Sequence, residues 1–156
     1  MKILLTKGNA EGQTQESAYC LALEKAGLMN LNLIFLSSVL PHNSEIVEAR
    51  PNFTYMDYGK KLYVIMSQIR TSQRNASICA GLGWMIEKQG DGNGLVVQVE
   101  GQNEEEVVSK INASLDEVAK NSDRKYTKIK IVTEKIICKR KSACALVALV
   151  FKLEDW

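Results

Sequence analysis

Residues that build metal and redox centres are scarce in this sequence. It contains one histidine and four cysteines among 156 residues. The cysteines are far apart and form no Cys-x-x-Cys pair, which argues against a zinc site or a thioredoxin-like site (Cys20, Cys79, Cys138 and Cys144). We therefore expect no metal, and free thiols in a reducing cytoplasm are the simplest interpretation.

Long apolar runs and a strong excess of one charge are absent as well. No stretch approaches the roughly 20 apolar residues of a membrane span, and the start, Met1 to Leu5, lacks the cleavage site of a signal peptide. The net charge is only +2, and the densest basic cluster, Lys139 to Lys141, is typical of a solvated turn. We expect a cytoplasmic protein that binds neither nucleic acid nor a membrane.

The composition that remains is that of an ordinary globular protein. Apolar residues make up 46% and charged residues 24%, and 156 residues fit one domain over 1–156.

Two closing strands follow each other directly and predict a hairpin around 139–142. That order breaks a βαβ series and favours an α+β fold with helices packed on sheets. The predicted strands are 2–6, 30–37, 62–69, 95–99, 127–138 and 143–153.

Two helices have recognisable ends. Thr14 suits the N-cap of the first helix, and Gly27 ends it. Asn103 and Glu106 form a capping-box-like start to the second. The stretch 76–86 fits either a helix or a strand, because its small residues suit close packing in both. Residues 8–13 and 41–58 predict loops, and 89–94 predicts a glycine-rich turn.

Residues 30–41 read N-L-N-L-I-F-L-S-S-V-L-P, an apolar run that stops at two hydroxyls. The run barely alternates, so we expect a strand that is buried on both faces. Ser37 and Ser38 can simply end that strand, as serines commonly do. Alternatively, one hydroxyl attacks the preceding carbonyl and turns the amide into an ester, β-elimination breaks the chain and leaves dehydroalanine, and hydrolysis of that residue gives a pyruvoyl group. That chemistry needs a stabilised oxyanion and a constrained backbone.

Further segments accompany this run: Gly8, Glu11-Gly12 and Thr14 before the first helix, Ala26-Gly27 at its end, Glu45-Ile46-Val47 after the proline, Gly94-Leu95 with Glu100-Gly101, and Cys144-Ala145. Together with Asn30 to Pro41, they closely resemble the pyruvoyl-dependent arginine decarboxylase family, whose relatives include the pyruvoyl-dependent histidine decarboxylases. The resemblance covers most of the chain and is poor over residues 50–90.

The resemblance implies cleavage between Ser37 and Ser38, with Asn32 supporting the processing. The products would be a β chain of residues 1–37 and an α chain of residues 38–156 that starts at a pyruvoyl group made from Ser38. The resemblance also implies an α/β sandwich of mostly antiparallel sheets, and a homotrimer or dimer of trimers with active sites between subunits. Its reaction would be decarboxylation of arginine to agmatine, a step of polyamine biosynthesis. The pyruvoyl carbonyl would hold the substrate amine and act as an electron sink, without PLP or a metal.

Two positions depart from the family pattern. The family has a proton-donating glutamate in G-L-x-x-E-x-E-G where this sequence has Gln98, and a carboxamide is no general acid. Glu100 faces the same side of the strand about 6 to 7 Å away. It is either a substitute acid acting through a water or a structural residue. The family also has an aspartate that recognises the guanidinium where this sequence has Cys20.

Other candidates are weaker. Glu16 and Glu24 lie one helical turn from Cys20 and either approach the same ligand or are solvated. His42 is either an acid near the pyruvoyl or an exposed loop residue, and Cys144 is expected to be a small buried residue. Trp84 and Tyr63 are expected to be packing residues. Two functions therefore stay open. One is an active amino-acid decarboxylase, and the other is a divergent homologue with altered or lost catalysis, such as a non-catalytic subunit or binding protein.

Overall fold

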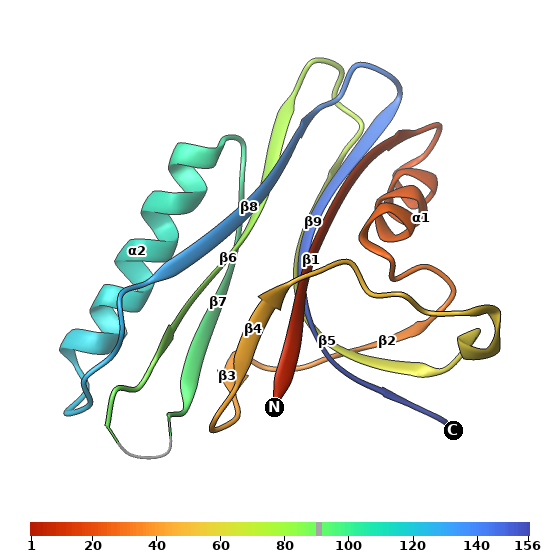
Figure 1. Ribbon diagram of the computed structural model, residues 1–156. Helices are drawn as coiled ribbons and strands as arrows, with labels where there is room; N and C mark the ends of the chain where they lie inside the picture. Colours follow the sequence, from red (N-terminus) through yellow and green to blue (C-terminus); the bar gives the residue numbers. More distant parts are fainter. Residues whose placement is uncertain (90–91) are drawn as a thin grey trace.

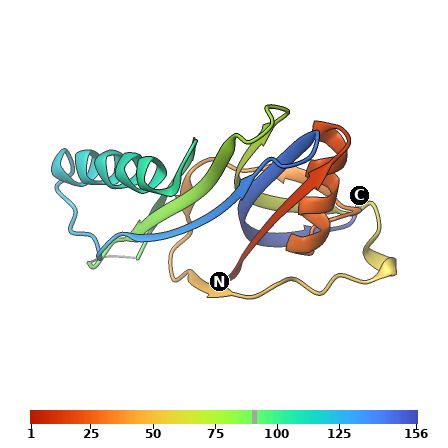
Figure 2. The same ribbon diagram turned by 90° about the horizontal axis from the view of Figure 1, so that it is seen from above.

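Two β-sheets lie face to face, and one helix covers the outer face of each (Figure 1, Figure 2). The computed structural model describes residues 1–89 and 92–156. The five-stranded sheet has the order β2-β5-β9-β1-β4, and the four-stranded sheet has the order β3-β7-β6-β8. The elements are β1 (Lys2–Gly12), α1 (Gln15–Ala26), β2 (Asn32–Phe35), β3 (Val39–Leu40), β4 (Glu45–Glu48), the short 3₁₀ helix η1 (Tyr55–Asp57), β5 (Lys61–Thr71), β6 (Ser77–Ile86), β7 (Gly94–Gly101), α2 (Glu104–Lys120), β8 (Lys130–Ile137) and β9 (Ser142–Glu154).

Within the described residues, all strand pairs of the four-stranded sheet are antiparallel, as are the two central pairs of the five-stranded sheet. The two parallel pairs are β1 with β4 and β2 with β5, and both lie at the edges of the five-stranded sheet. The predicted α+β sandwich of mostly antiparallel sheets is therefore confirmed. Within the described residues, neither helix is long and apolar enough to cross a membrane.

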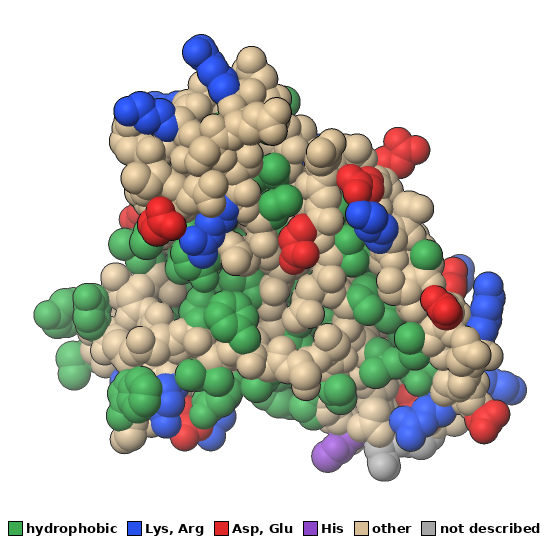
Figure 3. All heavy atoms as spheres, turned by 180° about the vertical axis from the view of Figure 1, so that it is seen from behind, with side chains coloured by type: hydrophobic (Ala, Val, Ile, Leu, Met, Phe, Trp, Pro, Cys, Tyr) green, Lys and Arg blue, Asp and Glu red, His purple; other side chains and the backbone are tan. Residues whose placement is uncertain are grey.

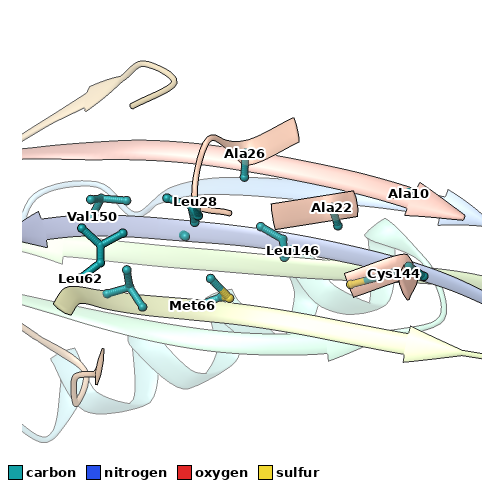
Figure 4. Close-up of a cluster of buried hydrophobic side chains, with 12 residues drawn as sticks. Ala10, Ala22, Ala26, Leu28, Leu62, Met66, Cys144, Leu146 and Val150 are labelled. Carbon is teal, nitrogen blue, oxygen red and sulfur yellow. The ribbon is translucent and has the colours of Figure 1, made fainter. Parts of the chain in front are cut away.

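The first helix begins and ends where the sequence predicts. The Thr14 side chain accepts the backbone N–H of Ser17, and Gly27 closes the helix in the left-handed conformation with φ 78°. Between these ends, α1 presents alanines to the five-stranded sheet. Ala22 and Ala26 are fully buried against Leu146 and its neighbours on β9 and β5 (Figure 4). Small side chains let the helix lie close to the sheet.

The second helix packs on β6, and this contact explains why 76–86 is a strand of small residues. Val107, Ile111 and Leu115 of α2 are buried over it. A side chain at Gly83 would overlap Ile111, so glycine at this position allows the helix to approach the strand. Asn103 caps α2 as predicted, with its side chain accepting the N–H of Glu106. The Glu106 carboxylate accepts the N–H of Gln102 instead of completing a capping box.

The interior between the sheets forms the third apolar layer. Ile3, Ile65 and Leu149 from one sheet meet Leu82 and Val96 from the other. Trp84 belongs to this layer and is buried, which confirms its packing role. The site described below lies where the chain crosses this interior from one sheet to the other.

Three predictions about local structure are wrong. Residues 8–13 are largely strand, because β1 continues to Gly12 in register with β9, where Gly12 faces Ser142. The closing strands form no hairpin, since β8 pairs with β6 in one sheet and β9 pairs with β1 and β5 in the other. The stretch 41–58 is not structureless, because it contains β4 and η1. In each case pairing across the fold decides a segment whose local composition is ambiguous.

The strand over 30–37 is also shorter and more exposed than predicted. It spans Asn32–Phe35 at the edge of its sheet and pairs only with β5. Phe35 is 59% exposed, so the expectation of burial on both faces is wrong. The predicted turn over 89–94 includes residues 90 and 91, which lie outside the described residues.

Candidate active site

Ser37 and Ser38 lie in the short link that carries the chain from the five-stranded to the four-stranded sheet. β2 ends at Phe35 in the first sheet, and β3 begins at Val39 in the second. Both ends of the link are anchored by backbone hydrogen bonds. The N–H of Leu36 donates to the carbonyl of Val64 on β5 (2.8 Å), and the N–H of Val96 on β7 donates to the carbonyl of Ser38 (3.0 Å). The peptide between the two serines is therefore held from both sides.

A tight turn is centred on Ser38. The backbone N–H of Val39 donates to the carbonyl oxygen of Ser37 at 2.9 Å, which closes a three-residue turn. The carbonyl that a Ser38 hydroxyl would attack thus already has a backbone donor on its oxygen. Ser37 is exposed and Ser38 is half-buried, so the second hydroxyl is the more sheltered of the two.

Gln98 lies beside Ser38. The Ser38 hydroxyl donates to the side-chain oxygen of Gln98 across 3.4 Å, a long hydrogen bond for two oxygens. The contact follows from the anchor at Val96, because Gln98 is two residues further along β7 and faces the same side. A carboxamide oxygen accepts this proton weakly and cannot carry it away as a base.

Glu100 is held elsewhere on the same strand. Its carboxylate oxygen lies 2.9 Å from the hydroxyl of Ser67, which lies equally close to the carbonyl of Val99 and accepts the N–H of Gly81 at 3.2 Å. Ser67 is fully buried, whereas Glu100 is exposed. A hydroxyl has one proton, so Ser67 donates to one of its two acceptors at a time. The carboxylate is thus tied to β5 across the gap between the sheets.

Asn32 stabilises the start of β2. Its side-chain N–H donates to the carbonyl of Gly59 at 2.5 Å, and its backbone N–H donates to the carbonyl of Lys60. The indole of Trp156 donates to the same Gly59 carbonyl at 2.9 Å. The structure therefore joins Asn32 to the turn before β5, five residues before Ser37.

The remaining candidates lie apart from this cluster. Cys20, Glu16 and Glu24 are exposed on α1, which packs on the outer face of the five-stranded sheet. His42 is exposed in the link between β3 and β4. Cys144 is fully buried, as predicted, and burial raises the pKa of its thiol to about 11. A cavity of about 340 Å³ beside the end of α1 is lined by Glu24 and residues of the 50–58 segment, but by neither Ser38 nor Gln98.

Sequence reasoning missed Ser67 and the backbone donors at Val39 and Val96. Ser67 had a visible signal, because it is a lone hydroxyl inside the otherwise apolar centre of a predicted strand. The backbone donors had none, since every residue except proline carries the same N–H. The turn that directs them exists only because two sheets meet at this link.

This chain belongs to the pyruvoyl-dependent arginine decarboxylase family, whose model matches residues 2–155. Members of that family are carboxy-lyases that depend on a covalent pyruvoyl group. The pyruvoyl-dependent arginine decarboxylase of Pyrococcus abyssi is 30% identical over 150 residues, covering 96% of this chain and 93% of the relative. The one from Pyrococcus furiosus is 31% identical over the same shares. The one from Methanothermobacter thermautotrophicus is 35% identical over 82 residues, or 53% of this chain and 52% of the relative.

Proposed function

We propose that this chain is a pyruvoyl-dependent decarboxylase of arginine, forming agmatine and CO₂, and that it makes its own pyruvoyl group by cleavage between Ser37 and Ser38. The observation that carries the proposal is the turn at Ser38. It directs a backbone donor at the Ser37 carbonyl and keeps the Ser38 hydroxyl in contact with Gln98. The names of the relatives support arginine as the substrate.

The cleavage follows from the atoms in this turn. The Ser38 hydroxyl oxygen bonds to the Ser37 carbonyl carbon and loses its proton, while the Val39 N–H stabilises the oxyanion. The carbon–nitrogen bond then breaks as its nitrogen takes up that proton, which leaves an ester and a free amine at residue 38. Loss of the α-proton of residue 38 expels the Ser37 carboxylate and leaves dehydroalanine. Water then replaces the nitrogen of that residue, ammonia leaves, and a pyruvoyl group remains.

Ser38 and its neighbours fit such a group. Ser38 is half-buried, the Gln98 side chain lies beside it, and its own carbonyl is held by the Val96 N–H. When formed, the pyruvoyl group supplies an electron sink for loss of CO₂. The protein then has to exclude water, orient the substrate and return a proton to its α-carbon.

Proton return is the weak step in this chain. Gln98 occupies the family's donor position and has no acidic proton. Glu100 is the nearest acid on the same face of β7, and Ser67 holds it on β5. We infer that arginine turnover is slow and passes its proton from Glu100 through water. The alternative of a homologue with altered catalysis rests on the same Gln98 and on Cys20, which has no carboxylate to pair with a guanidinium.

Assembly into a homotrimer or dimer of trimers completes the proposal. The η1 patch, which we define as Tyr55, Met56, Tyr58 and Trp156, consists of side chains that are 66% to 88% exposed. Figure 3 shows hydrophobic side chains gathered at the edge of the molecule that carries η1. Apolar groups gathered this way are typical of an interaction surface.

We further propose that the protein is cytoplasmic, in keeping with its four free cysteines.

Intact mass spectrometry of the purified protein tests the cleavage. We expect two chains, residues 1–37 and 38–156, with the second beginning at a pyruvoyl group. Ser38→Ala should stay intact, whereas Ser37→Ala should still cleave, because the carbonyl of residue 37 takes part and its hydroxyl does not. Release of CO₂ and agmatine from labelled arginine tests the substrate. A wild-type chain that remains whole after prolonged incubation would refute the proposed processing.

A further inference from the structure

The β5–β6 and β8–β9 loops lie at the end of the sheets opposite β3 (Figure 1), and they line a basic cavity. It measures about 540 Å³ and is formed by the loop between β5 and β6, the loop between β8 and β9, and the link that leads into α1. Six of the described residues line it, of which four are cationic and none is acidic (Gln13, Ser72, Arg74, Lys139, Arg140 and Lys141). Figure 3 shows Lys and Arg side chains at this end of the molecule. The basic cavity therefore carries four positive charges in a chain whose net charge is only +2.

The four cationic side chains form no ion pair among the residues that the structure describes. Over residues 1–89 and 92–156, no ion pair within 4.0 Å involves any of the four cationic side chains, although lysines elsewhere do pair, as Lys135 does with Glu104 at 2.7 Å. The nearby carboxylate of Glu11 accepts the backbone N–H groups of Lys139 and Arg140 at 2.5 and 2.7 Å. Those bonds, that of Arg140 above all, lower the pKa of Glu11. Glu11 thus binds the backbone of this loop, and its single charge offsets only part of the four positive charges around the cavity.

The walls of the cavity are fixed to each other. The hydroxyls of Ser72 and Ser142 lie 2.9 Å apart and join the two loops. The side chain of Gln15, in the first turn of α1, donates to Ser72 at 3.1 Å. Backbone hydrogen bonds run from Asn75 to the Cys138 carbonyl and from Cys138 to the Ala76 carbonyl, at 2.7 and 2.9 Å. The loop backbones therefore hold their spacing before any ligand arrives, which lowers the entropic cost of binding.

We propose that this basic cavity binds a small anion with more than one phosphate group. Arg74 comes from one loop, and Arg140 with the two lysines comes from the other. A ligand with several anionic groups can therefore contact both loops at once. Guanidinium groups bind phosphate through paired N–H donors, and the lysines add point charges. None of the described lining residues is aromatic, so a base has no ring to stack on, which favours a compact phosphate over single-stranded nucleic acid. This binding is independent of the proposed decarboxylation.

Titration calorimetry with inorganic tripolyphosphate on the full chain tests the site. We expect one ligand per chain, weaker binding of inorganic phosphate, and weakening by salt. The double variant Arg74→Gln/Arg140→Gln should raise Kd by about tenfold or more, which corresponds to the loss of about 1.4 kcal/mol. The matched control Lys125→Gln/Lys128→Gln removes the same charge from exposed residues outside the cavity and should change Kd by less than about threefold. Ser38→Ala should bind like the wild type, which separates this site from the decarboxylation.

Three results would overturn the proposal. The first is no binding heat with tripolyphosphate, and the second is equal weakening by both double variants, which would reveal a general charge effect. The third is tighter binding of a short single-stranded RNA that the cavity variant abolishes, which would make the hollow part of a nucleic-acid surface. Thermal melting of each variant confirms that it folds, and Lys139→Gln/Lys141→Gln provides a second cavity variant if the first does not.

Discussion

The hydroxyl of Ser38 lies 3.4 Å from the carboxamide oxygen of Gln98. Ser38 lies in the link that leads into β3, Gln98 lies on β7, and the Val96 N–H on the Ser38 carbonyl keeps the two residues together. If Ser38 is the pyruvoyl precursor, the nearest side chain to the reacting group is a neutral amide. Glu100, the next acid on that face, is held by Ser67.

Gln98→Glu should raise the rate of agmatine formation. A carboxyl group at this position restores a general acid, and such catalysis contributes typically about 10²- to 10⁴-fold. Adding Cys20→Asp should raise the rate further, because the guanidinium regains a charged partner. The measurement is kcat for CO₂ release by cleaved protein, with Gln98→Asn as a control that keeps an amide. Fast wild-type turnover that Glu100→Gln destroys would show that the donor has moved along β7.

Val39→Pro should slow the cleavage between Ser37 and Ser38. Proline has no backbone N–H, so the Ser37 carbonyl loses its donor, and the loss of one oxyanion donor costs about 10²- to 10³-fold. A time course of fragment formation after synthesis in vitro measures the rate. Val39→Ala keeps the N–H and serves as control. Equal rates in the two variants would assign the oxyanion to another donor.

Ser67→Ala should destabilise the protein by about 1 to 3 kcal/mol, because the buried groups around the hydroxyl lose their partner. The hydroxyl bonds to the Val99 carbonyl and the Gly81 N–H, so its loss affects the packing of β5 on the other sheet. Urea unfolding monitored by circular dichroism gives the free energy of unfolding. Ser109→Ala, on the exposed face of α2, should change it by less than about 0.5 kcal/mol. Similar losses of unfolding free energy in Ser67→Ala and Ser109→Ala would contradict the role of Ser67 as a link between the two sheets.

Alkylation should modify Cys20 long before the other cysteines. Cys20 is exposed, whereas Cys144 is fully buried and has a thiol pKa of about 11. At neutral pH that thiol stays protonated, and the thiolate is the reactive form. Burial also raises the pKa of Cys79 and Cys138. Iodoacetamide labelling with peptide mapping should show one fast site in the folded protein and four after unfolding. Rapid labelling of Cys144 would mean that α1 leaves the sheet readily.

Charge in the η1 patch should weaken assembly. Met56→Glu/Tyr58→Glu places carboxylates where we propose that subunits meet, and burying unpaired charge is costly. Sedimentation velocity should shift from a trimer, or a multiple of it, toward the monomer. Val118→Glu alters an exposed apolar residue of α2, outside the patch, and should not shift it. A wild-type monomer at the same concentration would refute the proposed assembly.

The sequence predicts those elements of the fold that depend on neighbours along the chain. Thr14 and Gly27 delimit α1 because capping is local. The strands that pair with β9 are distant along the chain. The short loop after Cys138 suggests a hairpin of β8 and β9, but β8 pairs with β6 in one sheet and β9 pairs with β1 and β5 in the other. Gly83 suits helix or strand until α2 packs over it.

In the candidate site, too, the sequence reveals residues that belong to a local motif but not the groups whose positions depend on packing. Ser37, Ser38 and Gln98 were found through their resemblance to a family motif, and the structure brings Ser38 and Gln98 into contact. It leaves Cys20 on α1 and ties Asn32 to Gly59. The Val39 donor and the Ser67 bridge depend on how the sheets are spaced, which no residue pattern specifies.

The link at Ser37 and Ser38 also acts as a tether between the two sheets. Leu36 is fastened to one sheet and Ser38 to the other, so a cut between them leaves each new end on its own side. Residues 1–37 contain β1, which is paired with β9 from Leu4 to Gly12 inside the five-stranded sheet. The small piece therefore cannot diffuse away without opening the centre of that sheet. Scission would give a noncovalent pair of complementing fragments, in which the two ends can separate and widen the seam between the sheets while the rest of the fold stays closed.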